Sequence, residues 1–217
     1  MVPNVLHAES RTQLFLLSPA YCGGRRAGYL LREGSTLPLA MRLVAGTLTL
    51  GEAFSFMSGL YFRGKLGYAR AFGRHETPAL VITPTRGLLP PETLVTPALL
   101  HEFATVDVDA GDHRYRRPLD RSLRSLARSL PPEARVILLG SIATGKYVDA
   151  LTRTFRERLH FPNDFVGRGD MSRGGLMLRS VAAGTELTYV VVSPEVQRRG
   201  TRPARLPPLR STAIFRN

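Results

Sequence analysis

The chain has 217 residues, of which 43% are hydrophobic, so it can bury a full core, and its length suits one domain. Thirty basic residues against 17 acidic ones leave a net charge of +13. No run approaches the roughly 18 apolar residues of a membrane span, and polar groups interrupt the beginning of the chain, which argues against a signal peptide and favours a soluble, cytoplasmic protein.

The charge excess is the strongest indication of a partner, because an excess of cations attracts polyanions such as nucleic acid. The alternative is a GC-rich genome that uses arginine codons freely, since all but two of the 30 basic residues are arginine. Codon bias exchanges Lys for Arg but creates no excess over Asp and Glu. The two lysines, Lys65 and Lys146, either mark positions that need a flexible, titratable amine or survive by chance.

Four apolar, β-rich runs predict strands buried on both faces, over residues 13–19, 79–84, 135–141 and 186–192. Between them, apolar residues three and four apart with Arg opposite predict helices over 37–46, 64–73, 119–130 and 146–159. Alternating strands and helices predict an α/β fold, a single domain with a mostly parallel central sheet flanked by helices. Residues 1–193 form the predicted core, and residues 194–217, rich in Pro and Arg, form a basic tail or strap.

Sites in such sheets lie at the carboxyl ends of the strands. Three predicted strands end in residues suited to ligand binding, and we expect these ends to converge on one edge. Ser18 follows the first strand, Arg86 follows the second, and residues 140–146 follow the third.

Residues 140–146 have the spacing of a phosphate-binding P-loop, with a strand before and a helix after. Tyr147 stands where that loop needs a Ser or Thr to hold Mg²⁺, which disfavours a nucleotide hydrolase. Two interpretations stay open: a turn in which Gly145 and Lys146 bind an anion, and a purely structural turn.

Two further segments combine features of a nucleic-acid site. In residues 18–27, a glycine-bearing turn precedes Arg25 and Arg26, which form either a phosphate clamp or a solvated pair. In residues 54–73, aromatic rings alternate with Arg63 and Lys65, a pattern suited to base stacking beside phosphate neutralisation. Most of these rings belong to the core, and only Tyr61 or Tyr68 is expected to be available to a ligand.

The glycine-rich run at residues 165–179 places one carboxylate, Asp170, between Arg168 and Arg173. The flanking cations would keep Asp170 ionised while they bind phosphate. Asp170 would then orient water or act as a base, or it forms only a salt bridge within a loop.

Metal and cofactor sites are not predicted. The carboxylates of residues 107–113 match no calcium loop and indicate an exposed acidic turn. The histidines are too isolated for zinc binding, and the single cysteine, Cys22, excludes a disulfide and is expected to be packed in the core.

Short motifs resemble the YaaA-like family of bacterial DNA-binding proteins linked to peroxide stress, and related small domains. The first strand runs into Ser18, Pro19 and Ala20 of the family's Ser-Pro-Ala-Lys, with Tyr21 in place of the Lys. Residues 87–90 are similar to part of its Gly-Leu-Leu-Arg-Pro stretch. Gly145, Tyr147 and Leu151 are similar to a Gly-x-x-Tyr-x-x-x-Leu helix start, with one residue instead of two between Gly145 and Tyr147. The resemblance implies an α/β core, a basic cleft, and duplex DNA as the ligand in a repair setting.

The leading hypothesis is a DNA-binding protein, with no membrane partner and an oligomeric state left open. Its phosphate contacts would line a cleft made by the strand-end loops: Arg25, Arg26, Arg63, Lys65, Arg86, Lys146, Arg168 and Arg173. The second hypothesis is an enzyme acting on nucleic acid, such as a base-excising glycosylase, in which Lys65 or Lys146 attacks the sugar and Asp170 assists. The third is a nucleotide-phosphate binder that uses the degenerate P-loop.

Overall fold

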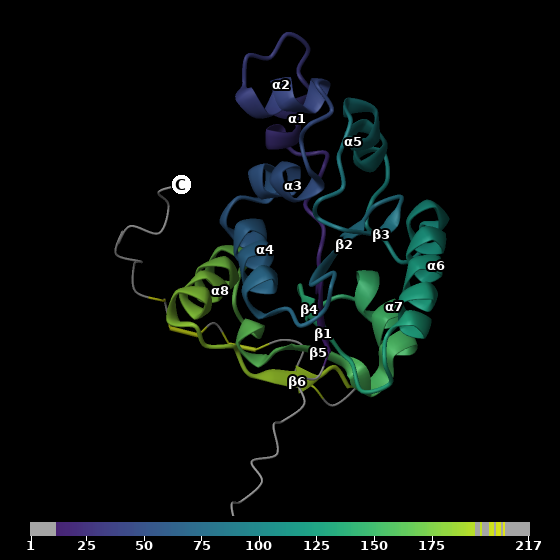
Figure 1. Cartoon of the computed structure of the whole chain (residues 1–217), viewed down its shortest axis with the longest axis vertical. Helices are drawn as coiled ribbons and strands as arrows, with labels where there is room; N and C mark the ends of the chain where they lie inside the picture. Colours follow the sequence, from purple (N-terminus) through teal and green to yellow (C-terminus); the bar gives the residue numbers. More distant parts are fainter. Residues whose placement is uncertain (1–11, 194–195, 197–199, 202, 205, 207–217) are drawn as a thin grey trace, which may run out of the picture.

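A computed structural model describes residues 12–193, 196, 200–201, 203–204 and 206. Its centre is a six-stranded sheet with the order β3-β2-β1-β4-β5-β6 (Figure 1). Strand β1 pairs in parallel with β2 and β4, and β4 pairs in parallel with β5, while β3 and β6 run antiparallel at the two edges. The strands are β1 (Gln13–Leu17), β2 (Ala79–Thr83), β3 (Gly87–Leu89), β4 (Arg135–Leu139), β5 (Leu159–Pro162) and β6 (Tyr189–Val191).

The predicted fold class is confirmed, because the sheet is mostly parallel and has helices on both sides. All four predicted strands are present, as β1, β2, β4 and β6. The two missed strands are short: β3 has three residues, and β5 has four, including a histidine and a final proline, so neither gives a long apolar run. Strands β1 and β4 lie in the middle of the sheet, and their side chains are buried except for that of Arg135, which is half-buried.

The helices form two layers and a group at one end (Figure 1). Helices α4 and α8 lie on one face of the sheet, α6 and α7 lie on the other, and α1, α2, α3 and α5 gather at one end. Their bounds are α1 (Arg25–Leu31), α2 (Pro38–Val44), α3 (Leu50–Ser58), α4 (Leu60–Phe72), α5 (Pro97–Ala104), α6 (His113–Ser129), α7 (Gly145–Phe155) and α8 (Asp170–Ala183).

Helices α2, α4, α6 and α7 lie where the sequence predicts them, but two predictions need correction. The predicted helix over 146–159 ends at Phe155, because Leu159 begins β5 and is buried against β4. The segment 165–179, considered as a loop, contributes ten residues to α8. Its glycines at 174 and 175 are buried, so they serve helix packing instead of loop conformation.

Helices α4 and α8 touch through their backbones. A Cβ atom at Gly64 would lie 2.7 Å from the carbonyl oxygen of Gly174, and one at Gly174 would lie 2.7 Å from that of Leu60. Only glycine permits this approach. It brings Lys65, the neighbour of Gly64, close to the first turns of α8, which carry Asp170 and Arg173.

Most of the predicted basic tail, residues 194–217, lies outside the described residues. Within the described part of the chain, no helix combines the length and the apolar character that crossing a membrane requires.

The contact between α4 and α8 predicts opposite effects for two glycines of the same helix. Gly64→Ala should lower the free energy of unfolding by about 2 kcal/mol or more, because the new methyl group meets backbone that cannot move aside. Gly67→Ala is the matched control, since its Cβ atom would meet nothing closer than 3.9 Å. It should be neutral or stabilising by up to about 1 kcal/mol. Urea denaturation measures both, and equal effects would contradict the close contact.

Candidate active site

The carboxyl ends of β1 and β4 lie side by side and begin the candidate site. The amide of Ser18 donates to the carbonyl of Leu139 at 3.2 Å, which aligns the two strand ends. Gly140 then packs so tightly that a Cβ atom there would lie 2.9 Å from both the Ser18 Cβ and the Tyr147 hydroxyl. The two predicted ends that follow β1 and β4 therefore do converge, around Ser18.

Helix α4 places the side chain of Lys65 at the end of β1. Its Nζ donates to the carbonyl oxygen of Ser18 at 2.6 Å and to the Ser18 Oγ at 2.9 Å. The amine also lies over two rings of its own helix, 4.4 Å from the centroid of Tyr61 and 4.7 Å from that of Phe62. Lys65 is 0% exposed. Amide, hydroxyl and ring contacts replace water, and no carboxylate bonds this amine among the described residues.

The environment of Lys65 favours its uncharged form. Burial lowers the pKa of Lys65 to about 7, the negative charge of Asp170 acts in the opposite direction, and Arg173 lowers the pKa further. A large share of the amine is therefore deprotonated at neutral pH. A deprotonated lysine has a free electron pair and can act as a nucleophile or as a base.

Three tyrosine hydroxyls surround this end of the sheet. The Tyr147 hydroxyl accepts a hydrogen bond from the amide of Ser141 at 3.1 Å; burial raises the pKa of Tyr147, and the Ser18 hydroxyl lowers it. Tyr61 from α4 and Tyr115 from α6 interact electrostatically with Tyr147, and burial raises the pKa of each. The Tyr115 hydroxyl is buried without a hydrogen-bond partner in the described structure, whereas the buried Tyr61 hydroxyl interacts with Arg173. A buried hydroxyl without a partner is costly.

Helix α8 supplies the charged groups of the site. The Arg173 Nε donates to the carbonyl of Phe165 at 3.1 Å, and its guanidinium lies over the Phe165 ring at 5.7 Å. The Arg173 Nη1 lies 3.5 Å from the Asp170 Oδ1. The Asp170 side chain is 67% exposed and that of Arg173 12% exposed. Arg173 also packs near Gly140 and Phe161, with no space between them large enough for a water molecule.

The structure corrects the role predicted for three residues. Ser18, Tyr61 and Lys65 were expected to contact nucleic acid at the surface, but they are 6%, 5% and 0% exposed. Tyr68, the other tyrosine considered for a ligand, is also buried, and its hydroxyl bonds that of Tyr189 at 2.6 Å. The alternation of rings and cations arises because α4 is a largely buried helix on which Arg63 and Arg70 face outward.

The prediction that Asp170 is held between two arginines is half correct. Arg173 pairs with Asp170, but Arg168 turns away and donates to the carbonyl of Asp164 at 2.9 Å and to the Ser172 hydroxyl at 3.3 Å. Asp170 begins a helix, and this geometry sends the two arginine side chains in different directions.

The other predicted phosphate ligands do not form one cleft lined by free cations. Arg86 pairs with Glu102, and Arg26 donates to the carbonyl of Phe56 at 3.2 Å. Arg25, Arg63 and Lys146 are exposed and have no acidic partner in the part of the chain that the structure describes.

The P-loop spacing belongs to a different kind of turn. A P-loop leaves its amides free for phosphate, whereas here the amide of Ser141 bonds the Tyr147 hydroxyl. The carboxylate of Asp149 lies over Gly145, 2.4 Å from where a Cβ atom would stand, and would repel an anion. Tyr147 thus explains the missing Ser or Thr, since its ring joins the turn to the site around Ser18.

Metal ligands are not grouped in the described residues, where no three His, Cys, Asp or Glu side chains are placed to hold an ion. In the acidic turn, Asp112 caps α6 by accepting from the amide of Arg114 at 2.8 Å. Cys22 is packed in the core as predicted, and burial raises the pKa of its thiol to about 12.

No family model, curated protein or solved structure matches this chain. The resemblance to YaaA-like proteins therefore stays a prediction. Two of the residues that carry it, Ser18 and Tyr147, are members of the site described here, whereas Gly145 lies at the start of α7.

The lowered pKa of Lys65 predicts a distinctive dependence of stability on pH. The ordinary pKa of lysine is 10.5, so above pH 7 the unfolded chain holds this proton while the folded chain loses it. The free energy of unfolding should therefore rise between about pH 7 and 8.5, by roughly 1 kcal/mol per pH unit. Lys65→Met should abolish the rise and Lys146→Met should preserve it, as measured by urea denaturation. A rise that persists in Lys65→Met would show that another group titrates.

Proposed function

We propose that this chain is a DNA-binding protein that carries out amine chemistry on the bound nucleic acid, with Lys65 as the reactive group. One observation carries the proposal: a fully buried lysine amine at the carboxyl end of parallel strands, held by Ser18 and with no bonded carboxylate in the described structure. Lysines in cores are rare, and those with a lowered pKa are frequent at catalytic sites.

A purely structural role for Lys65 fits the same hydrogen bonds less well. Burying an amine is costly, and an apolar side chain of similar length would fill the space between the two rings without that cost. The unpaired hydroxyl of Tyr115, which acts on Tyr147, adds a second unfavourable feature beside the same strand ends. Buried polar groups that lower the stability of the fold and lie together are typical of sites that bind a ligand or catalyse a reaction.

The class of reaction that fits an uncharged amine is attack on the sugar carbon that carries a base. The electron pair of the Lys65 nitrogen forms a bond to that carbon, and the bond to the base breaks with its electrons leaving on the base. The proton lost by the nitrogen passes to the base, so the products are the free base and a covalent lysine adduct. Asp170 and the Tyr61 hydroxyl interact electrostatically with the site and are suited to relay this proton.

Access to Lys65 requires a movement, since the amine has no exposed surface. Arg173 is the side chain suited to it, because its charge acts on Lys65 and its partner Asp170 is open to solvent. An arriving phosphate would compete with Asp170 for the Arg173 guanidinium and draw it outward. A base turned out of the duplex would then reach the strand ends.

Nucleic acid is the proposed substrate because of the net charge of +13, which exceeds what a small neutral ligand needs. The nucleotide-phosphate binder is favoured least. The turn that would cradle the phosphate has its Ser141 amide occupied by Tyr147 and the Asp149 carboxylate at its start.

Borohydride trapping on duplex DNA tests the proposed chemistry. An amine that reaches an abasic site loses water with the sugar aldehyde to give an imine, which borohydride reduces to a stable link. We expect a covalent protein–DNA product with an abasic duplex, lost in Lys65→Met and retained in Lys146→Met, because Lys146 is exposed at the start of α7 and bonds none of the groups around Ser18.

Mass spectrometry of the wild-type product identifies the linked lysine and requires no variant, so the test does not depend on the folding of Lys65→Met. A link on Lys146 or on the amino terminus alone would refute the role of Lys65. The amine chemistry also fails if no product forms on abasic duplexes or on duplexes with deaminated or oxidised bases.

A further inference from the structure

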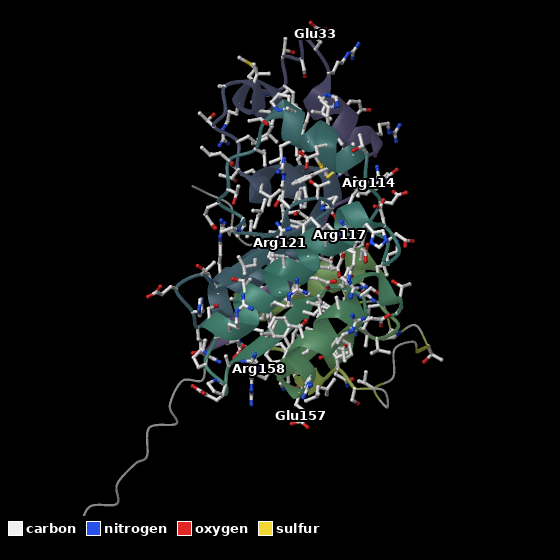
Figure 2. The ribbon with its side chains drawn as sticks, turned by 90° about the vertical axis from the view of Figure 1, so that its right-hand side faces the viewer. Glu33, Arg114, Arg117, Arg121, Glu157 and Arg158 are labelled. Atoms are coloured by element: carbon white, nitrogen blue, oxygen red, sulfur yellow. The ribbon has the colours of Figure 1, made fainter. Side chains whose placement is uncertain are left out.

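Helix α6 carries a row of arginines that the strand-end hypothesis did not use. Arg114, Arg117, Arg121, Arg124 and Arg128 follow one another at intervals of three and four, and all are exposed. Figure 2 shows the first three along the face of the molecule that α6 occupies. We call the five arginines together the α6 row. The opposite stripe of the helix, including Tyr115, Leu119 and Leu123, is buried.

We infer that the α6 row is the surface on which this protein binds the phosphate backbone of duplex DNA. The inference takes its partner from the proposed function but does not depend on the chemistry of Lys65. A competing explanation of the α6 row is an ordinary solvated face, on which arginines alternate with acidic residues that pair with them. The α6 row has few such acidic neighbours. Arg114 pairs with Asp112, whereas the other four arginines have no acidic partner in the described structure.

A groove between α6 and α7 extends the positive surface. It has a volume of about 410 Å³ and contains Arg124 and Arg128 from α6 and Arg153 from α7. Its one carboxylate, that of Asp120, is already bonded at 2.9 Å by Arg116, which lies outside the row. The groove therefore keeps three uncompensated cations around small side chains, an arrangement suited to a phosphate group.

The dimensions of the row fit a duplex. The four unpaired arginines extend over about 16 Å of helix, which corresponds to about five base pairs at the rise of B-DNA. Proteins that bind single strands add exposed aromatic rings for base stacking. Among the described tyrosines and phenylalanines, only Tyr21 and Tyr29 are exposed, and neither lies on α6 or α7. The wide major groove of B-DNA admits a helix, whereas the deep, narrow groove of duplex RNA does not, so the row favours DNA.

The cations of the strand ends are less suited to this task. Of the eight predicted there, Lys65 is buried, and four arginines bond a carboxylate or carbonyl groups of the protein. The unpaired cations on α6 are therefore more numerous and more regular than those at the strand ends.

A pair of double variants with equal charge change tests the inference. Arg121→Gln/Arg124→Gln removes two cations of the α6 row, and Arg25→Gln/Arg63→Gln removes two exposed, unpaired cations of the strand-end region. Binding to a fluorescent 20-base-pair DNA duplex is measured by anisotropy from about 50 to 300 mM salt. The row variant should lower the slope of log K against log salt by about 2 and weaken binding by about tenfold. The strand-end variant should change the salt slope and the affinity less than the row variant does.

Each outcome decides between the alternatives. Equal or larger losses in the strand-end variant, or tighter binding to duplex RNA of the same sequence, would overturn the inference. Lys65→Met should retain the wild-type salt slope, because its amine is buried. Loss of trapping in that variant with the slope intact separates the chemistry from the docking surface. Failure of the wild-type protein to bind any duplex would instead refute the proposed function as a whole, and the inference with it.

Discussion

The buried amine of Lys65 is the constraint on which the site depends. An amine removed from water needs substitutes for its lost hydrogen bonds, and Ser18 supplies two while the rings of Tyr61 and Phe62 supply the rest. These contacts form only if α4 lies directly against the end of β1. The contact between Gly64 and Gly174 packs α8 closely against α4, and Lys65 has no exposed surface.

Much of the fold could be predicted because three central strands are continuous apolar runs. Strands β1, β2 and β4 are largely buried on both faces, and such strands consist almost entirely of apolar residues. The strands β3 and β5 could not be predicted in this way, because β3 has only three residues and the apolar side chains of β5 are interrupted by a histidine. Helix α8 was missed for another reason: glycine usually indicates a loop, and only the position of α4 shows that Gly174 serves helix contact.

The sequence indicated several residues of the candidate site but not what each of them does there. Ser18, Lys65 and Asp170 were identified from strand ends, the rarity of lysine and an isolated carboxylate. In the structure Lys65 bonds Ser18, and Asp170 acts on Lys65 only through its charge. The sequence could not reveal that the lysine points inward, because a cation beside aromatic residues is equally typical of a nucleic-acid surface. In the sequence Tyr147 resembles a defect in a P-loop, whereas in the structure its hydroxyl accepts a hydrogen bond from the Ser141 amide. Tyr115 carried no signal beyond helical spacing.

Helix α6 links the two parts of the proposed activity. Its outer side carries the unpaired arginines, and its inner side carries Tyr115, whose unpaired hydroxyl interacts electrostatically with Tyr147. The two sides of one helix are separated by about 10 Å. A duplex held along the outer side lies on the face of the sheet opposite α4, so a base would reach Lys65 only by passing around the strand ends. Tyr115 and Tyr147 connect α6 to those strand ends, and Arg173 of α8 stands on the far side of them. The docking surface and the amine are therefore separate parts of the molecule, which is why their variants are expected to have separable effects.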